Sequence, residues 1–473
     1  MSSINPEPIF TAASDIIFAP ATPLVPAALA IVRISGEGAI PLLKDAFSRY
    51  PALIDAPSHT IHHGQLADPR DGSLVDEVLL SIFQAPRSYT GEDTVEISCH
   101  GNPLIVQRIL NLLHYLGARP ALPGEFTRRA FVNGKMDLSR AEAVADVIAA
   151  SSDHALAIAQ RQYTGAFAMQ VQRIRGKLVE CTMLLEYSLD FPEEEAAASL
   201  QTPEAMRAES AASELIAELG SLLEACRAGK RAEAGARCVF AGPPNAGKST
   251  LFNHLLREER AIISPIPGTT RDMLHEQVQW DGHLIALYDT AGLCARGTAR
   301  SAALEEQGMQ RSRQEIANAD IVLFLASDHA AEEARAAYTD VLQNAAKETV
   351  ILRARTKADL LPEAERFAEP GVFLISVHSG QGVPELIAEI KKCLRAAQGY
   401  DAADAFLASE RQRAALEAAL SLAESAAKAL RDGAPELASS DIRHAADELA
   451  GVLGIVTSGE VLDAIFSRFC IGK

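Results

Sequence analysis

The sequence lacks the features of a membrane-spanning or disulfide-bonded protein. No run of about 18 uncharged apolar residues occurs, and the first residues do not have the basic, apolar and small-residue order of a signal peptide. The 7 cysteines are odd in number, scattered and free of Cys-x-x-Cys pairs. That pattern argues against a disulfide framework and against a zinc site. We therefore expect a cytoplasmic protein without a membrane span.

Positive charge is also scarce. The 44 lysines and arginines are outnumbered by 62 acidic residues, and the net charge is -18. This balance argues against a protein that coats nucleic acid, because phosphate binding needs clustered Lys and Arg. The densest basic cluster consists of Arg128, Arg129, Lys135 and Arg140. It is either a local nucleic-acid site or a solvated face.

The 473 residues predict about three domains. Up to about residue 120, short apolar runs such as Ala28–Ile34 and Thr94–Ser98 alternate with turns, and Leu104–Leu116 has helical spacing, which together indicate an α+β domain. Long helical patterns follow, and the small, charged segment Gly229–Ala236 is predicted to be a hinge.

Strands and helices then alternate from about residue 235 to 398, in the doubly wound α/β pattern. Helical spacing returns after this segment. We expect one helical domain made of two separated segments, with the α/β domain inserted between them. The predicted domain boundaries are 1–128, 129–233, 234–398 and 399–473.

A glycine-rich loop follows the apolar run Cys238–Phe240. The phosphate-binding pattern G-x-x-x-x-G-K-[ST] is present at Gly242, Gly247, Lys248 and Ser249. Backbone N–H groups and a helix N-terminus can cradle a polyphosphate. Lys248 can neutralise its charge and the Ser249 hydroxyl can ligate Mg²⁺. A glycine turn before a helix is the alternative, which the ordered motifs further along the chain disfavour.

Those later motifs predict a GTPase. Asp289–Gly292 closes an apolar strand, where the aspartate can hold the Mg²⁺ shell and the glycine can approach the γ-phosphate. In the polar segment Pro267–Asp272, Thr270 can complete the Mg²⁺ coordination. In Thr356–Asp359 the Asp359 carboxylate can accept hydrogen bonds from guanine, although Thr356 stands where Asn is usual.

The usual catalytic glutamine is absent. Leu293 occupies the position at which Ras-like enzymes carry the residue that orients water. Glu305 and Glu306 are the nearest carboxylates, and they could equally form the solvent face of a helix. Asn245 offers a carbonyl oxygen that could hold a monovalent cation beside the phosphates, or it simply turns the loop.

Charged residues also alternate with apolar ones in two N-terminal strands. Arg33 lies between Val32 and Ile34, and Glu96 is similarly placed in its own strand. Exposed strand charges are the interpretation that the strand pattern alone favours.

Nearly the whole chain resembles the MnmE (TrmE) family of bacterial tRNA-modifying GTPases. Besides the GTPase motifs, the resemblance rests on Ile31–Gly36, Thr90–Asp93, Cys99–Gly101, Pro123–Phe126, Arg129–Asn133, Lys135–Leu138, Asp190–Glu194 and Phe469–Lys473. It implies a folate-binding-like α+β domain that mediates dimerisation, a discontinuous all-α domain, and an inserted Ras-like P-loop G domain.

The resemblance also implies an activity and partners. Such proteins are K⁺-dependent GTPases that form homodimers and act with an FAD-dependent, NADH-using partner of the MnmG (GidA) family, as a heterotetramer. Together they add an aminomethyl or carboxymethylaminomethyl group to C5 of wobble uridine-34 in tRNA. The one-carbon unit comes from a tetrahydrofolate derivative, 5-formyl- or methylene-tetrahydrofolate.

Matching positions transfer the family's sites to this chain. The folate site involves Arg33, Glu96, Lys135 and Lys473, which reverses the exposed-charge interpretation for the first two. The implied Mg²⁺ ligands are Ser249 and Thr270, and the implied K⁺ ligands are Asn245, Ser264, Ile266 and Thr269. The GTP contacts fall on Asn245, Ala246, Gly247, Lys248, Ser249, Thr250, Ser264, Thr269, Thr270, Asp289, Thr290, Ala291, Gly292, Thr356, Lys357, Asp359 and Ser376.

Three residues are assigned to catalysis. The family's water-activating glutamate lies three residues before a helix glycine, here Gly308, which selects Glu305 over Glu306. Lys248 acts on the phosphates. Cys470 resembles a terminal cysteine implicated in modification, and a buried apolar cysteine is the competing interpretation.

This chain departs from the family at several places. They are Pro23–Ala28 in place of a glycine-rich segment, Asn102 in place of a second glycine, Cys294 in place of arginine, three extra residues before Glu305, and Thr356 in place of the usual asparagine. The GTPase core alone would also suit a regulatory switch in ribosome assembly or signalling that performs no modification. A helical protein with a vestigial nucleotide fold is a third alternative, which the intact Lys248, Thr270 and Asp289 disfavour.

Overall fold

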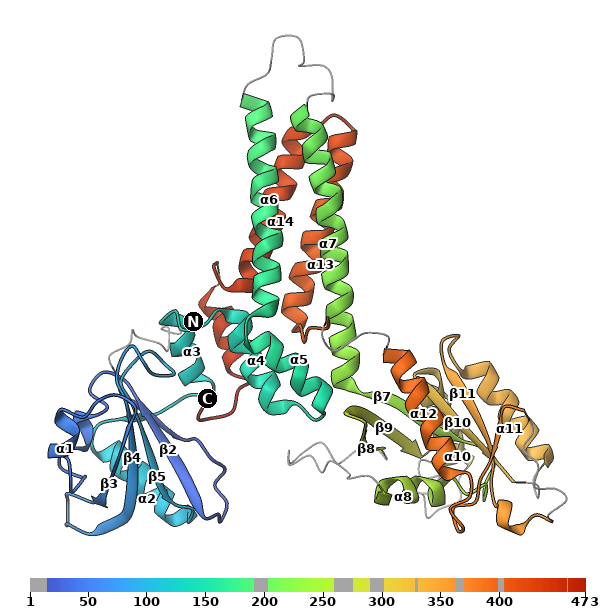
Figure 1. Cartoon of the computed structure of the whole chain (residues 1–473), viewed down its shortest axis with the longest axis horizontal. Coiled ribbons are helices and arrows are strands. Elements are labelled where there is room, and N and C mark those ends of the chain that lie inside the picture. The colour runs from blue at the N-terminus through green and yellow to red at the C-terminus, as the bar shows by residue number, and fades with distance from the viewer. Residues whose placement is uncertain are drawn as a thin grey trace, which may run out of the picture. The chain divides into compact units, whose positions relative to one another are not determined.

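The computed structural model (Figure 1) describes residues 15–190, 203–258, 275–289, 302–327, 331–362, 370–398, 404–456 and 458–473. The chain forms two compact units. The first comprises Met1–Ala145, Ala168–Arg175 and Ala446–Lys473, and the second comprises Asp146–Phe167 and Gly176–Ala445. Within the described ranges, none of the helices is both long and apolar enough to cross a membrane.

The first unit contains a six-stranded sheet with the order β3-β4-β5-β2-β1-β6. The strands are β1 (Ile17–Pro20), β2 (Leu29–Ser35), β3 (Thr60–Ala67), β4 (Leu74–Phe83), β5 (Thr94–His100) and β6 (Arg119–Pro120). The neighbouring pairs are antiparallel, apart from β1 with β6. Alternation places Val32 and Ile34 on one face, in the buried core with Val95 and Ile97.

Helix α2 (Pro103–Tyr115) contributes Val106, Ile109 and Leu112 to this same core. Asn102 is its N-cap, and its side chain accepts a hydrogen bond from the backbone N–H of Leu104 at 2.9 Å. Asparagine is among the best residues at this position. Asn102 therefore caps the start of α2. Two short helical segments, Pro41–Leu43 and α1 (Pro51–Ile54), precede β3.

The opposite side of β1 contacts α3 (Glu125–Val132), where Phe126 packs with Ile17 and Ala19. A second small core joins α4 (Leu138–Ala149) to α15 (Gly459–Phe466). Gly124, before α3, has a φ of 67°, and a Cβ there would lie 2.7 Å from the carbonyl oxygen of Phe466. Only glycine allows this approach, which brings the C-terminal segment onto the N-terminal part of the chain.

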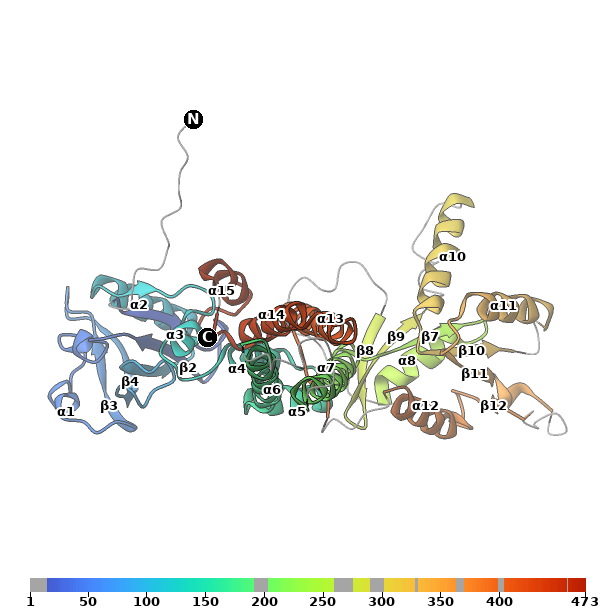
Figure 2. The ribbon, with the colours of Figure 1, turned by 90° about the horizontal axis from the view of Figure 1, so that it is seen from above.

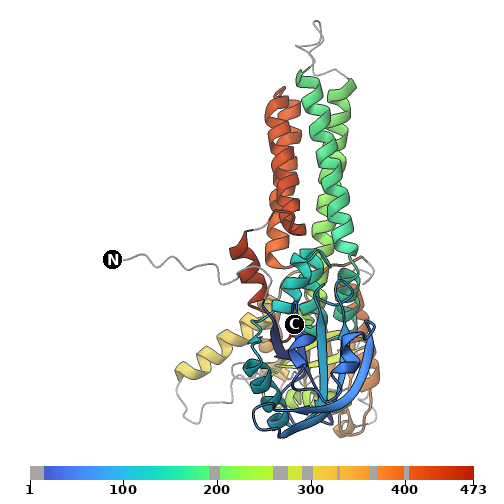
Figure 3. The same ribbon diagram turned by 90° about the vertical axis from the view of Figure 1, so that its left-hand side faces the viewer.

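The second unit contains long helices. They are α5 (Asp153–Tyr163), α6 (Ala166–Asp190), α7 (Pro203–Ala234), α13 (Glu410–Arg431) and α14 (Pro435–Leu453), of which α6 and α14 run on into the first unit. Figures 1 and 3 show α6, α7, α13 and α14 lying side by side. The predicted face of α13 is buried, including Leu416, Ala423 and Leu430. Ser409 and Gln412 form a capping box at its start.

The predicted hinge at Gly229–Ala236 is wrong. Helix α7 continues through this segment to Ala234, and Gly235, with a φ of 72°, turns the chain directly into the next strand. Gly229 is buried, and a Cβ there would lie 2.0 Å from the carbonyl oxygen of Phe406. This glycine therefore permits a close approach of two segments, and the helix stays intact.

The inserted domain contains the second sheet, with the order β12-β11-β10-β7-β9-β8. Its strands are β7 (Ala236–Ala241), β8 (His275–Trp280), β9 (His283–Asp289), β10 (Ile321–Ala326), β11 (Val350–Arg355) and β12 (Val372–Leu374). All neighbouring pairs are parallel except β8 with β9.

Helices cover both faces of this sheet. Leu251 of α8 (Lys248–Glu258) and Leu386 of α12 (Val383–Gln398) pack on one face. Ile316 of α10 (Ala302–Ala317) and Val341 of α11 (Ala331–Asn344) pack on the other. The predicted α+β, all-α and inserted doubly wound α/β parts are therefore confirmed.

Candidate functional site

The glycine-rich loop joins β7 to α8 at the carboxyl edge of the parallel strands. Gly242 has a φ of 139°, and a Cβ there would lie 2.0 Å from the carbonyl oxygen of Leu325 in β10. Asn245 and Gly247 also have positive φ angles, of 60° and 85°. The backbone therefore follows a path that few side chains permit, and the loop ends at the N-terminus of α8, where an anion can bind.

Lys248, the first residue of α8, is only 6% exposed. Its ammonium group donates hydrogen bonds to the carbonyl oxygens of Gly242 and Pro243, both at 2.8 Å. The charge is thus held within the curve of the loop. A phosphate oxygen could take over one of these contacts, because a lysine ammonium has three donors on a flexible stem.

Two predicted ligands of Mg²⁺ or its water shell meet beside the loop. The hydroxyl of Ser249 donates to Oδ2 of Asp289 at 2.7 Å, which joins the start of α8 to the end of β9. Asp289 is largely buried. Hydroxyl and carboxylate oxygens are hard donors of the kind that Mg²⁺ prefers, so these two residues fit the metal.

The base-binding loop is connected to the phosphate loop through Thr356. Its hydroxyl donates to the carbonyl oxygen of Ala246 at 2.9 Å, and its N–H donates to the carbonyl oxygen of Ala326 at 2.8 Å. The threonine thus supplies a buried donor at the first position of the motif. Nearby, the hydroxyl of Ser376 donates to Oδ1 of Asp359 at 2.6 Å, which orients the predicted guanine-binding carboxylate.

Several predicted residues fall outside the described part of the molecule. They are Ser264, Ile266, Thr269, Thr270, Thr290, Ala291, Gly292, Leu293 and Cys294. Glu305 and Glu306 belong to α10, but their side chains are also outside the described part. The K⁺ site and the catalytic glutamate therefore stay predictions, whereas Asn245, Ala246, Lys248, Ser249 and Asp289 converge in space.

Arg33 and Glu96 form the centre of a second candidate site. They are cross-strand partners in β2 and β5, and Nε and Nη2 of Arg33 lie 2.9 and 2.8 Å from Oε1 of Glu96. The guanidinium carbon also lies 5.5 Å from the ring centre of Tyr89 and 5.7 Å from that of Phe126. The side chains are 16% and 23% exposed. The interpretation of both as exposed strand charges is therefore wrong.

The C-terminal segment completes this cluster. Nη1 of Arg33 donates to the carbonyl oxygen of Gly472 at 3.4 Å. Gly472 has a φ of 100°, and a Cβ there would lie 2.3 Å from the carbonyl oxygen of Pro20. Burial and the charge of Arg33 lower the pKa of the neighbouring Lys473 ammonium, against the opposing charge of Glu96. Three of the four predicted folate residues thus lie together.

The fourth residue, Lys135, makes a different described contact. Its ammonium donates to the carbonyl oxygen of Pro86 at 2.8 Å. Cys470 is exposed, so the competing interpretation of a buried apolar cysteine is wrong.

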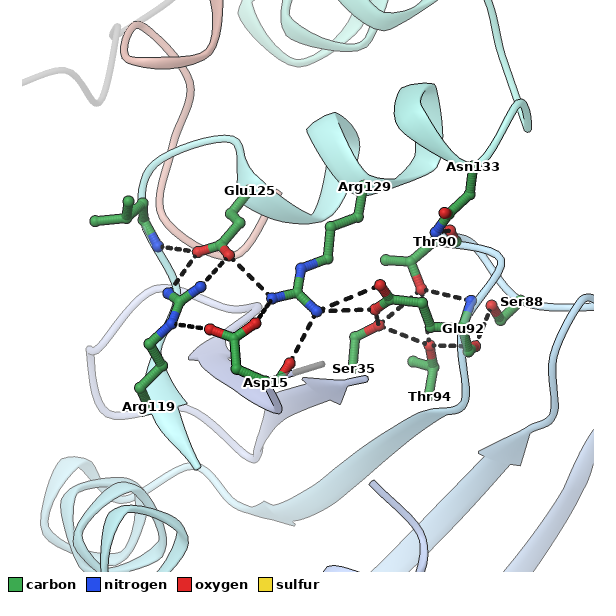
Figure 4. A network of polar contacts seen from close by, with 11 residues as sticks. Asp15, Ser35, Ser88, Thr90, Glu92, Thr94, Arg119, Glu125, Arg129 and Asn133 are labelled. Atoms are coloured by element: carbon green, nitrogen blue, oxygen red, sulfur yellow. Dashed lines mark hydrogen bonds and ion pairs between the residues drawn. The ribbon is translucent and has the colours of Figure 1, made fainter. Parts of the chain in front are cut away.

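Sequence reasoning missed an ionic network that joins three of the family motifs (Figure 4). The guanidinium of Arg129 contacts Glu92 at 3.1 Å, Glu125 at 3.1 Å and Asp15 at 2.7 Å. Arg119 contacts both Asp15 and Glu125. The spacing of four between Glu125 and Arg129 on one helix was the available signal. The other members, Asp15, Glu92 and Arg119, are distant in sequence from one another or lie in other segments, so no local pattern indicated their contacts.

Ion pairs also account for two members of the candidate basic cluster, Arg128 and Arg129. Arg129 is 11% exposed and surrounded by carboxylates. Arg128 is 15% exposed and forms an ion pair with Asp463 at 3.2 Å. Of the two alternatives for this cluster, neither a nucleic-acid site nor a solvated face describes these arginines. They connect α3 to its neighbours.

Comparisons with known proteins agree with these features. A model of the MnmE helical domain matches residues 138–470, and a model of the N-terminus of the GTP-binding protein TrmE matches residues 16–135. The tRNA modification GTPase MnmE of Carboxydothermus hydrogenoformans is 36% identical over 469 residues, covering 97% of this chain and 99% of the relative. That of Symbiobacterium thermophilum is 41% identical over 456 residues, covering 94% and 96%.

Among solved structures, the G domain of the FeoB iron transporter of T. maritima is 24% identical. It covers 33% of this chain and 98% of its own, with a TM-score of 0.25.

Proposed function

The chain belongs to the MnmE family of tRNA modification GTPases, and from this premise we propose that it couples K⁺-dependent GTP hydrolysis to wobble-uridine modification. The enzyme hydrolyses GTP and acts in tRNA modification. The proposed product is tRNA with an aminomethyl or carboxymethylaminomethyl group at C5 of the wobble uridine. The proposed partner is an FAD-dependent protein of the MnmG family, which binds a cytoplasmic homodimer of this chain.

The arrangement around Lys248 supports the nucleotide part of this proposal most directly. The buried ammonium, the Ser249–Asp289 pair and the Thr356 bridge lie along one edge of the sheet, as phosphate, metal and base contacts require. Mg²⁺, when bound, neutralises phosphate charge. Lys248 binds the phosphates, and Asp359, oriented by Ser376, accepts hydrogen bonds from guanine.

We propose that K⁺ supplies the positive charge that other GTPases obtain from an arginine finger. Asn245, in a left-handed conformation inside the loop, would provide a ligand together with Ser264, Ile266 and Thr269. Replacing Na⁺ by K⁺ should raise GTP turnover sharply while nucleotide affinity changes little. Equal turnover in the two salts would exclude this role.

Glu305 is the proposed activator of the attacking water, because Leu293 has no polar group to replace the usual glutamine. Glu305→Ala should abolish turnover and leave nucleotide binding intact. Glu306→Ala is the matched control and should retain turnover. Loss of turnover from the control alone would assign the role to Glu306.

The Arg33 cluster is the proposed tetrahydrofolate site. Guanidinium and ammonium groups suit the glutamate carboxylates of a folate, and the Glu96 carboxylate can accept hydrogen bonds from pterin N–H groups. Arg33 already contacts the carbonyl oxygen of Gly472, the residue before Lys473, and Lys135 is the proposed fourth contact. The one-carbon unit would come from 5-formyl- or methylene-tetrahydrofolate.

Nucleoside analysis tests the modification directly. The tRNA of a strain without this protein should contain unmodified wobble uridine, and the wild-type gene should restore the modification. Intact modification in the deleted strain would favour a regulatory GTPase switch instead.

A further inference from the structure

The last turn of helix α10 packs into the core of its domain. Ile316, and Ala319 just beyond the helix, lie in the core with Val239 and Phe324. By contrast, Met309 is 51% exposed. Figure 2 shows α10 extending away from the sheet. The contacts at this end therefore help to set the direction in which α10 runs.

Arg237 is the principal polar contact at that end. This residue of β7 directs its Nη2 to Oε2 of Glu315 in α10 at 2.9 Å. The same nitrogen lies 3.2 Å from the hydroxyl oxygen of Tyr288, and the guanidinium carbon lies 5.0 Å from the centre of that ring. The backbone N–H of Arg237 donates to Asp320 at 2.8 Å, which fixes the base of the side chain.

Tyr288 connects this contact to the nucleotide site. It immediately precedes Asp289, whose carboxylate accepts the hydrogen bond from Ser249. Tyr288 is buried on the α10 side of the sheet. A displacement of α10 that pulls on Arg237 therefore acts on the residue adjoining the predicted ligand of the Mg²⁺ water shell.

The surroundings of Arg237 leave room for such a displacement. A cavity of about 350 Å³ lies beside it, lined by residues of α7, β7 and β9 and by Asn318 and Asp320. Nε of Arg237 is buried and has no hydrogen-bond partner among the described residues. The guanidinium thus has both an unused donor and space in which to turn, so it can keep contact with Tyr288 while α10 changes its angle.

We infer that Arg237 is a positioning residue for GTP hydrolysis. It fixes the C-terminal end of α10 relative to the end of β9. Its guanidinium links Glu315 to Tyr288 and so sets α10, with Glu305, relative to Asp289. This inference rests on the proposed role of α10 in catalysis. A residue that only stabilised the fold would affect nucleotide binding and turnover together, whereas a positioning residue affects kcat with the dissociation constant of GDP unchanged.

The test uses the full-length chain with saturating K⁺, Mg²⁺ and GTP. Arg237→Met keeps the length of the side chain and removes its donors, and it should lower kcat roughly tenfold, the order expected for one charge-assisted contact. The GDP dissociation constant should stay within about twofold. Arg237→Lys should recover part of kcat, because an ammonium can still pair with Glu315.

Glu315→Gln provides a second route, which keeps the inference testable if Arg237→Met folds poorly. It should lower kcat, and the double variant should lose no more than Arg237→Met, because both changes break one contact. Arg313→Met is the matched control. It breaks another ion pair of α10, with Asp340 at 2.8 Å, which does not reach Tyr288, and should leave kcat unchanged.

Wild-type kcat in both Arg237→Met and Glu315→Gln would overturn the inference, and so would an equal loss in Arg313→Met. Parallel loss of GDP affinity would show a purely structural role. Glu305→Ala is measured alongside. If it retains turnover, the proposed catalytic role of Glu305 fails, whatever the Arg237 variants do.

Discussion

The two candidate sites differ in how the chain assembles them. The nucleotide loop is mainly backbone: glycines with positive φ angles, carbonyl oxygens and a helix start, within one continuous segment. The Arg33 cluster is made of side chains from distant segments, since Arg33 and Glu96 are 63 residues apart and Gly472 is 439 residues from Arg33. A local motif therefore identifies the phosphate loop of the first site, whereas the second site has no local motif and is assembled by folding. Their responses to substitution should differ accordingly.

The largest effect should come from the charge inside the loop. Lys248→Ala removes a buried ammonium that two carbonyl oxygens hold in place. GTP turnover should fall by at least about 100-fold, the usual cost of removing one group that stabilises developing charge. The exposed Lys347, changed to alanine, is the control and should leave turnover unchanged. Steady-state phosphate release measures both, and turnover within a fewfold of wild type in Lys248→Ala would contradict the assignment.

The bridge between the two nucleotide loops should have a smaller effect. Thr356→Val keeps the shape and removes the hydroxyl that donates to Ala246. A buried carbonyl then loses its partner, which should cost about 1–2 kcal/mol of GDP binding free energy. Thr356→Ser retains the hydroxyl and should bind GDP like the wild type. Calorimetric titration distinguishes them, and identical affinities would mean that the bridge is not needed.

In the side-chain site, Glu96→Gln should affect ligand binding more than folding. The pair with Arg33 is half-buried, so its loss should cost about 1 kcal/mol of stability. Binding of 5-formyl-tetrahydrofolate should weaken roughly tenfold. The exposed pair of Glu77 with His63 offers a control, and Glu77→Gln should change neither quantity. If the two variants bind the folate equally, the cluster is not its site.

The smallest effect is a local response to acid in the network around Arg129. Burial opposes ionisation of Asp15 and Glu125, but hydrogen bonds and charges of Arg119 and Arg129 outweigh it and lower both pKa values below their ordinary 3.8 and 4.5. The ionised forms thus favour the fold. Their contribution is complete above those ordinary values and is lost as the pH falls through the lowered ones.

Hydrogen exchange can locate this loss. Protection factors of α3 should fall as the pH drops below about 4. The apolar contacts of α2 carry no such charges, so its protection should persist over the same range. A uniform loss in both helices would instead indicate general acid unfolding.

Sequence periodicity predicted the elements well, because alternation and helical spacing directly reflect which side is buried. It correctly placed Arg33 and Glu96 opposite the apolar face of the sheet, and it wrongly left them exposed. Helix α3 and the C-terminal segment bury them, and no local sequence pattern predicts that distant segments pack over a strand. The resemblance to a family supplied that information.

Gly229 is a second example of a contact between distant segments that local sequence did not predict. A glycine among small and charged residues indicates a break in a helix, yet here it lies inside α7 because Phe406 needs the space. Thr356 was similarly ambiguous until Ala246 was seen to accept its hydrogen bond. Each error concerns a contact between distant segments, which a single sequence does not reveal.

The network in Figure 4 also constrains how this protein can evolve. Three carboxylates, Asp15, Glu92 and Glu125, share the guanidiniums of Arg119 and Arg129. Replacing the largely buried Arg129 by a neutral residue removes the cation that contacts the largely buried Glu92, which is more costly than replacing both partners. Among relatives, substitutions at these positions should therefore occur in compensating pairs, and a lone change at Arg129 should be the rarest of all.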